Sequence, residues 1–432
     1  MQALRWNAWR DLWPDRRPGG DPAVEPGCGA DNAPATASDL APNEERYVLA
    51  EALTPATYVT PWAHLIEGPL DAERLRLALG KMAERHDVMR TCYHRHGPAT
   101  WTRAVLPDAR PLLKLLVRPG QSLAQLRAEL EPWLFAPVDF TPATLCRFAL
   151  VRIAPESHWF IFSMHHALSD GTSFNLFMEE LFGIYDGEAP SSPAVAYRSL
   201  FPADWRSEPR YRSDFAWWNE RLAGLEPPDG LPADLEGDDP RAVAAECEMP
   251  IPEPDAGMVA AAAAAMGVSP FTIWLAAALT VISRLQDDRQ VVAAFQTSSR
   301  RSVPGSERAQ GCFSNALVLS LAIDQGEPVA GLVRRVREEM RAALQHENVP
   351  FHDVLQATGV HPTVGINWFP PMPPIACRSL EVHPAQNLGR SSDYQLNLRF
   401  IQSAQGLRLI LYYRPGILSG QLAEAVTHRI IA

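Results

Sequence analysis

The chain has 432 residues, more than one hydrophobic core usually serves, so at least two subdomains are expected. Its 47% hydrophobic residues are typical of a globular protein, and its net charge of -11 argues against a nucleic-acid-binding protein. The six cysteines are scattered without a Cys-x-x-Cys pair, which favours a reducing cytosol over a disulfide framework or a zinc site. No apolar run is long enough to cross a bilayer.

The N-terminal residues are predicted to form a tail. Residues 1–17 place three tryptophans among four arginines without an uninterrupted apolar core, which is not the pattern of a signal peptide. The pattern allows an amphipathic helix that docks on a partner, but a loosely held tail is favoured because chain termini are commonly poorly ordered. Residues 18–42, rich in Pro, Gly, Ala and Asp, are typical of a linker.

The first clear helix is predicted over residues 71–86. Asp71 suits the N-cap position, and Leu75, Leu79 and Met82 fall on one face. Two strands are predicted further on, over residues 145–153 and 157–164, with a turn-like connection between them.

A pair of histidines follows the second of these strands. Residues 164–173 read Met-His-His-Ala-Leu-Ser-Asp-Gly-Thr-Ser, and a helical pattern follows over residues 174–185. Neutral imidazole is a competent general base near pH 7, and loops held by a rigid scaffold commonly carry catalytic side chains. A histidine pair at a strand end is more often structural, but here the strand, the turn, Asp-Gly and the helix occur together. The order favours a catalytic interpretation.

The second half of the chain is predicted to begin after a Pro-, Gly- and Asp-rich segment near residue 227. Ser269 and Pro270 are typical of a helix start, and the following run over residues 271–285 is apolar nearly all round, which predicts a buried helix. A strand is predicted over residues 290–296, a charged amphipathic helix over 329–345 and a further strand over 364–369.

The stretch His-His-x-x-x-Asp-Gly resembles the active-site motif of the condensation domains of nonribosomal peptide synthetases, which belong to a superfamily with chloramphenicol acetyltransferase-like folds. Weaker matches to motifs of the same family occur before and after this stretch, in the order expected along the chain. They lie at residues 85–91 (Arg-His-Asp-Val-Met-Arg-Thr), 214–218 (Asp-Phe-Ala-Trp-Trp), 311–315 (Gly-Cys-Phe-Ser-Asn) and 346–351 (His-Glu-Asn-Val-Pro-Phe). The resemblance covers residues 40–432.

The resemblance implies an α/β (α+β) fold of two chloramphenicol acetyltransferase-like lobes forming a V with a central active-site tunnel. The expected divisions are a tail and linker over residues 1–39, an N-terminal lobe with the histidine motif over 40–226, a linker over 227–240 and a C-terminal lobe over 241–432.

The resemblance also assigns roles in the motif. His166 is expected to be the working residue, either as a general base or by orienting the acceptor and stabilising charge. His165 is expected to orient the loop, and Gly171 to permit a tight turn or keep the channel open. Asp170 is expected to pair with an arginine of the other half, for which Arg301 is the best match and Arg300 the next.

Four further residues are candidates for lining the tunnel, with simple packing as the alternative. They are Asn315, Trp368, Ser391 and Ser392. His94-x-His96 has two possible metal ligands but no third nearby, so no metal site is expected.

The family's reaction suggests a free-standing condensation enzyme. It would transfer an acyl group from the phosphopantetheine thioester of an acyl or peptidyl carrier protein, supplied in trans, to an amine or hydroxyl on a small-molecule or carrier-bound acceptor. The chain contains neither an adenylation motif nor the Gly-Gly-x-Ser of a carrier protein, which favours chain release as an amide or ester. The enzyme itself is expected to bind no cofactor, nucleic acid or membrane, and to be a monomer.

Three alternatives stay open. One is an acyltransferase of the same superfamily that uses acyl-CoA, and the second is an epimerase-like member that needs no acceptor. The third is a non-catalytic module that recruits carrier proteins, although such modules commonly lose the motif residues that are intact here, namely His165, His166, Asp170 and Gly171.

Overall fold

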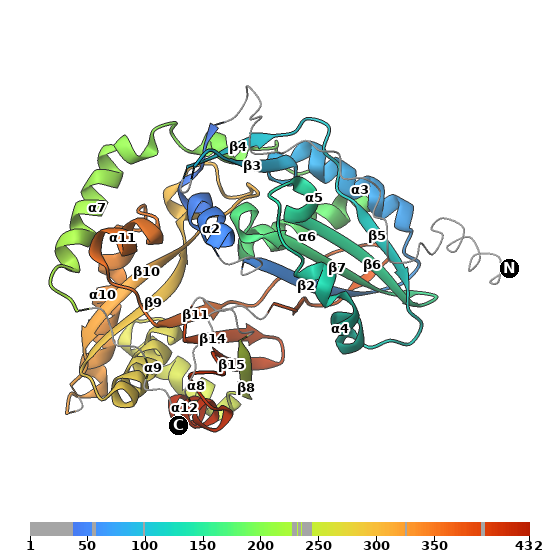
Figure 1. The fold of residues 1–432 in the computed structure, drawn as a ribbon. Helices are drawn as coiled ribbons and strands as arrows, with labels where there is room; N and C mark the ends of the chain where they lie inside the picture. Colours follow the sequence, from blue (N-terminus) through green and yellow to red (C-terminus); the bar gives the residue numbers. More distant parts are fainter. Residues whose placement is uncertain are drawn as a thin grey trace.

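The computed structural model describes residues 38–53, 58–97, 100–226, 231, 235, 244–324, 326–389 and 394–432. The predicted tail over residues 1–37 therefore lies outside the described residues. In the described part, two six-stranded sheets and one three-stranded sheet are covered by helices. Figure 1 shows two bodies side by side, one built mainly from the first half of the chain (blue to green) and one from the second (yellow to red).

The sheet of the first body carries the histidine motif. Its strands are β2 (Val59–Glu67), β5 (Leu113–Val117), β6 (Cys146–Ala154), β7 (Ser157–His165), β12 (Glu381–Val382) and β13 (Gln386–Asn387). They lie in the order β12-β2-β7-β6-β5, and β13 also pairs with β2. β7 is antiparallel to both neighbours, while β5 and β6 are parallel. β6 and β7 were correctly predicted as strands.

Both faces of this sheet are covered, which explains the unbroken apolar run over residues 159–162 of β7. Phe160 and Phe162 pack into the cluster that includes residues of α3 (Ala72–Arg85) and α6 (Gly171–Tyr185). Trp159 and Ile161 point to the opposite face, under α4 (Leu123–Leu134). Alternate side chains of a strand point to opposite faces, so a strand buried on both sides favours apolar residues at successive positions.

The predicted helix after Asp71 is confirmed. Asp71 Oδ1 accepts hydrogen bonds from the backbone nitrogens of Glu73 at 2.9 Å and Arg74 at 3.1 Å. The predicted apolar face of α3 is fully buried, including Leu75 and Leu79.

The remaining elements of the first half are short or peripheral. They are α2 (Pro42–Leu53), α5 (Pro142–Leu145), α7 (Pro209–Arg221), β1 (Ser38–Asp39), β3 (Thr91–Arg95) and β4 (Trp101–Val105), with the small sheet ordered β1-β4-β3.

The second body has a sheet of its own. Its strands are β8 (Ala245–Pro250), β9 (Gln290–Ser298), β10 (Ser314–Ala322), β11 (Val364–Phe369), β14 (Leu396–Ser403) and β15 (Gly406–Tyr413), in the order β10-β9-β11-β14-β15-β8. Its helices are α8 (Glu253–Met266), α9 (Pro270–Gln286), α10 (Val329–Gln345), α11 (Phe351–Thr358) and α12 (Gly420–Ile431). The predicted buried helix is α9, which starts at the predicted cap because Ser269 Oγ accepts from the Thr272 nitrogen at 3.2 Å.

The second half of the chain contributes two short strands to the sheet of the first body. β12 and β13 come from the second half but pair antiparallel with β2 of the first sheet. Of the predicted linker over residues 227–240, only Leu231 and Leu235 are described. The chain therefore passes from the second body to the first and back between β11 and β14. α7, from the first half, already packs on the second body, where Trp218 belongs to its core cluster (Figure 1).

No single helix of the described residues is long and apolar enough to cross a membrane. Of these helices, α8 and α9 are long and apolar enough only when taken together, and the two are bent by 109° relative to each other.

Candidate active site

The histidine motif lies where a strand ends and a helix begins, as predicted. β7 ends at His165, a 3-10 turn spans His166–Leu168, and α6 begins at Gly171. The turn is fixed at its start because the backbone nitrogen of His166 donates to the Tyr58 carbonyl at 3.0 Å.

His165 is buried, with 1% of its surface exposed. Its Nδ1 accepts from the backbone nitrogen of Ala167 at 3.2 Å, so the ring proton lies on Nε2, which is 3.3 Å from a Glu51 carboxylate oxygen. Both ring nitrogens are thus used to hold the loop against α2. The geometry supports the expected orienting role.

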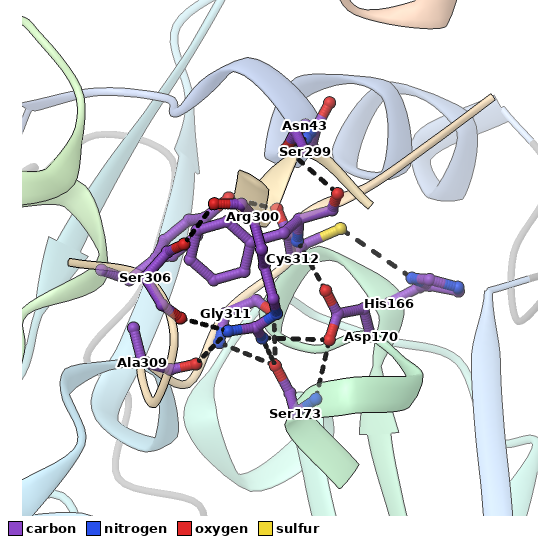
Figure 2. A network of polar contacts seen from close by, with 12 residues as sticks. Asn43, His166, Asp170, Ser173, Ser299, Arg300, Ser306, Ala309, Gly311 and Cys312 are labelled. Atoms are coloured by element: carbon purple, nitrogen blue, oxygen red, sulfur yellow. Dashed lines mark hydrogen bonds and ion pairs between the residues drawn. The ribbon is translucent and has the colours of Figure 1, made fainter. Parts of the chain in front are cut away.

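His166 is partly exposed, and its ring is held on one face by an aromatic neighbour. The Tyr47 ring of α2 stacks on it with ring centroids 4.3 Å apart and an interplanar angle of 5°. The Nδ1 atom lies 3.9 Å from the sulfur of Cys312 in the other half of the chain. Figure 2 shows this contact and places the second ring nitrogen, Nε2, on the far side of the imidazole.

Asp170 is 3% exposed and serves as the N-cap of α6. Its Oδ1 accepts from the Ser173 nitrogen at 2.7 Å and lies 3.1 Å from Arg300 Nη2. Its Oδ2 accepts from the Phe313 nitrogen at 3.0 Å. Both oxygens are therefore bonded within the protein, and the carboxylate joins the histidine loop to the second half (Figure 2).

The arginine that pairs with Asp170 is Arg300, so the choice of Arg301 was wrong and the second-ranked residue is the partner. The Arg300 side chain is 10% exposed and also donates to Ser173 Oγ at 2.7 Å. Arg301 is 67% exposed and lies 3.4 Å from Glu347. Residues Ser299–Ser302 form a 3-10 turn, in which neighbouring side chains point in different directions, and motif counting cannot resolve a shift of one residue there.

The segment Gly311-Cys312-Phe313 is fixed by several hydrogen bonds besides the one to Asp170. Ser173 Oγ donates to the Gly311 carbonyl at 2.6 Å and accepts from the Gly311 nitrogen at 3.1 Å. Tyr197 Oη donates to the Cys312 carbonyl at 2.5 Å. The Tyr197 ring packs so closely that a Cβ at position 311 would lie 2.0 Å from it, so only glycine fits.

Gly171 does not have the conformation that a tight turn would need. It is the first residue of α6 and is not among the glycines with positive φ. A Cβ at this position would meet nothing within 4 Å. The turn interpretation is therefore wrong, and the open space beside Gly171 fits the second expectation, that a small residue keeps the approach clear.

The described tunnel candidates form packing contacts. Asn315 is 2% exposed; its amide nitrogen donates to the carbonyls of Glu347 at 3.0 Å and Val349 at 2.8 Å, and its oxygen accepts from the Phe351 nitrogen at 2.9 Å. Asn315 is thus a structural tie, which fits the alternative of simple packing, and its place along the tunnel stays a prediction. Trp368 is half-buried and packs among aromatic rings of α9 and β14. Ser391 and Ser392 lie outside the described residues.

The possible metal ligands of the described residues lie elsewhere than His94 and His96. His94 Nε2 lies 3.4 Å from the Cys92 sulfur, and His96 Nε2 lies 2.8 Å from Thr102 Oγ1. Two other groups bring three ligand atoms within 4.8 Å of one another, namely Glu45 with His352 and Asp353, and Glu67 with Glu381 and His383. Arg206 pairs with both carboxylates of the first group, which is therefore an ion-pair cluster.

Three residues that contact the motif were missed by the sequence analysis. Tyr47 and Glu51 are four residues apart on α2, and the third is Cys312. A helix predicted over residues 42–53 would have placed the first two on one face. No sequence signal could have brought that face to the histidines, because the contact spans more than 100 residues of chain.

The site thus places the His166 imidazole at the end of a sheet strand, beside a buried Asp170–Arg300 pair that joins the two halves of the chain. Residues 42–367 match the family model for the Condensation domain, so the chain belongs to the condensation-domain family, as the motif resemblance predicted. Condensation domains catalyse amide-bond formation, an acyltransferase-type reaction, and work with carrier-protein phosphopantetheine arms.

Similar proteins agree with this assignment. Nonribosomal peptide synthetase penN of Penicillium thymicola is 27% identical over 388 residues, which make up 84% of this chain but 13% of that protein. The starter condensation domain of rhizomide synthetase, in a mutant form in complex with C8-CoA and Leu-SNAC, has a TM-score of 0.78 at 19% identity, covering 92% of this chain and 93% of that one.

The X-domain from teicoplanin biosynthesis, in complex with OxyB, has a TM-score of 0.77 at 20% identity, covering 93% of this chain and 95% of that one. These likenesses establish the chloramphenicol acetyltransferase-like fold.

Proposed function

We propose that this chain transfers an acyl group from the phosphopantetheine thioester of a carrier protein to an amine, or to a hydroxyl, with His166 at the reaction centre. The observation that carries the proposal is the difference in exposure among the residues of the motif. His166 is partly exposed, while His165 and Asp170 are buried and bonded within the protein. His166 is thereby the histidine of the motif that reactants can reach.

The chemistry follows from the thioester. The acceptor's nitrogen or oxygen attacks the thioester carbonyl, the tetrahedral intermediate expels the thiolate, and the attacking atom loses a proton. Because Nδ1 faces Cys312, Nε2 is the nitrogen that we assign to the reactants. Nε2 can accept the acceptor's proton as a general base, or it can donate to the developing oxyanion. No covalent acyl-enzyme is needed.

We further propose that the carrier protein acts in trans and that the product is released as an amide or ester. Within these 432 residues, neither an adenylation motif nor a Gly-Gly-x-Ser carrier motif occurs, so the donor carrier lies outside them. The described cysteines are all free, which supports action in the cytoplasm. The proposed enzyme holds no cofactor of its own and works as a monomer.

Two alternatives have specific support. The rhizomide starter domain was solved with C8-CoA, which makes an acyl-CoA donor a candidate. The teicoplanin X-domain was solved in a complex with OxyB, which makes a recruitment role a candidate. The buried Asp170–Arg300 pair and the partly exposed His166 favour catalysis over recruitment here.

The deciding experiment offers the same acyl group as a carrier-bound thioester, as acyl-CoA and as a short soluble thioester, each with a panel of amines and alcohols. Intact-protein and product mass spectrometry then follow acyl loss and product mass. The proposal predicts turnover that is fastest from the carrier, with the acceptor's mass in the product. Faster turnover from acyl-CoA would select the first alternative. Carrier binding without turnover across the whole panel would select recruitment, and a change of stereochemistry without acceptor would select an epimerase.

A further inference from the structure

The Cys312 thiol is the only described cysteine sulfur within hydrogen-bonding distance of a histidine of the motif, and the proposed function gives it no part. It belongs to the second half of the chain, 146 residues from His166, and it is fully buried. Its sulfur lies 3.9 Å from His166 Nδ1, a long but usable distance for a sulfur hydrogen bond.

The backbone that carries this thiol is held at three consecutive residues. Gly311 exchanges two hydrogen bonds with Ser173, the Cys312 carbonyl accepts from Tyr197, and the Phe313 nitrogen donates to Asp170. Ser173 and Asp170 belong to the start of the helix that follows the histidine loop. The sulfur and the imidazole are therefore positioned by one rigid assembly, visible in Figure 2.

The thiol is suited to a weak, permanent contact rather than to reaction. Burial, with Asp170 nearby, raises the pKa of Cys312 well above its usual range, so the sulfur keeps its proton. A neutral thiol is a poor nucleophile, but it has two ways to contact Nδ1. If its S–H donates to Nδ1, the ring proton lies on Nε2, which then donates to the oxyanion; if the sulfur accepts from an Nδ1 proton, Nε2 is unprotonated and acts as the base.

Two contacts restrict the His166 ring in different ways. The stacked Tyr47 ring fixes the plane of the imidazole, and the sulfur at Nδ1 fixes its rotation within that plane. With both in place, the direction of Nε2 is set before any reactant binds. Small displacements of a catalytic group are costly, because a misplacement of about 1 Å can lower a rate by about a hundredfold.

We propose that Cys312 is a positioning residue for His166, whose neutral thiol contacts Nδ1 and, with the Tyr47 ring, aims Nε2 at the thioester and the acceptor. The inference rests on the proposed function of His166 but uses a contact that the reaction itself does not require. It predicts that the thiol influences the rate of the chemical step and not the binding of substrates.

The chain offers a matched control. The Cys92 sulfur also lies against an imidazole nitrogen, His94 Nε2 at 3.4 Å, is also fully buried, and belongs to the small sheet. The test compares Cys312→Ala, Cys312→Ser and Cys92→Ala with the wild type. Steady-state kinetics with varied acyl-carrier and acceptor separate kcat from KM, thermal unfolding reports stability, and the 15N resonance of His166 Nδ1 reports the contact without turnover.

We expect Cys312→Ala to lower kcat by about tenfold with KM unchanged, because orientation is lost and not binding. Cys312→Ser, which keeps a donor of similar size, should stay within about threefold of the wild type. Cys92→Ala should leave kcat and the His166 resonance as they are. The Nδ1 resonance should shift in Cys312→Ala.

A kcat within twofold of the wild type for Cys312→Ala would overturn the inference, as would an equal loss in the serine and alanine variants. If the wild type transfers no acyl group at all, the proposed function fails. The Nδ1 resonance then decides whether Cys312 holds the ring, because an unchanged resonance would remove the contact on which the inference stands.

Discussion

Asp170 and Arg300 meet across the two halves of the chain, and each is almost entirely withdrawn from water. Asp170 also holds the start of α6 and the backbone of Phe313, so both carboxylate oxygens are engaged within the protein. Such a buried pair acts mainly by holding the two halves in position. Removing one partner destabilises the protein, because the other charge is left buried and uncompensated. Arg301, one residue further on, is exposed, and its buried partner Glu347 also accepts from Ser302 Oγ at 2.7 Å and Thr297 Oγ1 at 3.1 Å.

The two neighbouring arginines should therefore behave very differently. Arg300→Ala is expected to lower the free energy of unfolding by about 3–5 kcal/mol and to abolish most activity, since Asp170 is left unpaired. Arg301→Ala should cost less than about 1 kcal/mol, because solvent screens the exposed guanidinium and Glu347 keeps its hydrogen bonds from Ser302 and Thr297. Urea denaturation of both variants measures the difference. Equal losses would contradict the assignment of Arg300 as the partner.

The sequence was sufficient to find the histidine motif, its strand and its helix, because these are local patterns. It did not distinguish Arg300 from Arg301, because the two are adjacent in a 3-10 turn whose direction depends on packing. The contacts of Tyr47 and Cys312 with His166 depend on how distant segments meet, and no local pattern encodes that.

At the scale of elements, the segment before β10 is as important as the histidine loop itself. Gly311 passes so close to Tyr197 that any side chain would overlap the ring, and Tyr197 in turn bonds the next carbonyl. Displacing this segment would move both Cys312 and the Phe313 nitrogen that binds Asp170.

Adding one methyl group at position 311 should therefore lower both stability and activity. Gly311→Ala is expected to cost about 1–3 kcal/mol of stability and to lower activity at least tenfold, because overpacking forces the Tyr197 ring to move. Gly80→Ala is the matched control. It lies within α3 and has open space, so it should stabilise by about 0.5–1 kcal/mol. Thermal unfolding and acyl-transfer assays report both effects, and a harmless Gly311→Ala would refute the close-packing argument.

Elements with strong local signals were predictable, and short ones were not. The caps at Asp71 and Ser269 began the two helices where expected. β12 and β13 have only two residues each, which is too short for any alternation of polar and apolar residues to be recognised. Their pairing with β2 is a tertiary event, so the contribution of two second-half strands to the first sheet could not have been predicted from the sequence.

At the scale of the whole molecule, the doubly covered first sheet buries two histidines that take no part in the site. His64 lies on β2 and His158 on β7, and both are almost fully buried. Burial lowers the pKa of each to about 4, from a usual 6.5, and Arg152 adds to the effect on His158. Both are therefore neutral in the folded protein near pH 7.

The two buried histidines make the folded protein less stable at low pH. Between pH 6.5 and about 4 the unfolded chain binds protons at these positions while the folded chain does not, so folding stability must fall as the pH falls through this window. Each histidine can account for roughly 3 kcal/mol at the acid end. Asp353 and Glu45 raise the pKa of His352 against the effect of burial. Its contribution to stability is therefore lost only as the pH rises above 6.5.

Replacing one buried histidine should flatten this dependence. His64→Gln is expected to lose less stability than the wild type between pH 7 and pH 4.5, whereas His428→Gln, at an exposed site, should follow the wild type. Urea denaturation at several pH values provides the comparison. Parallel curves for His64→Gln and the wild type would show that His64 titrates normally in the folded protein.

The most direct test of the account is a single-turnover measurement of acyl loss from a loaded carrier protein, followed by intact-protein mass spectrometry in the wild type and in His166→Ala. The account predicts transfer to the acceptor in the wild type and a rate at least about a hundredfold lower in the variant, the usual range for losing a proton-transferring group. Thermal unfolding should be similar in both, because His166 is partly exposed. Equal rates in the two proteins would contradict the role of His166, while leaving the fold and the family assignment intact.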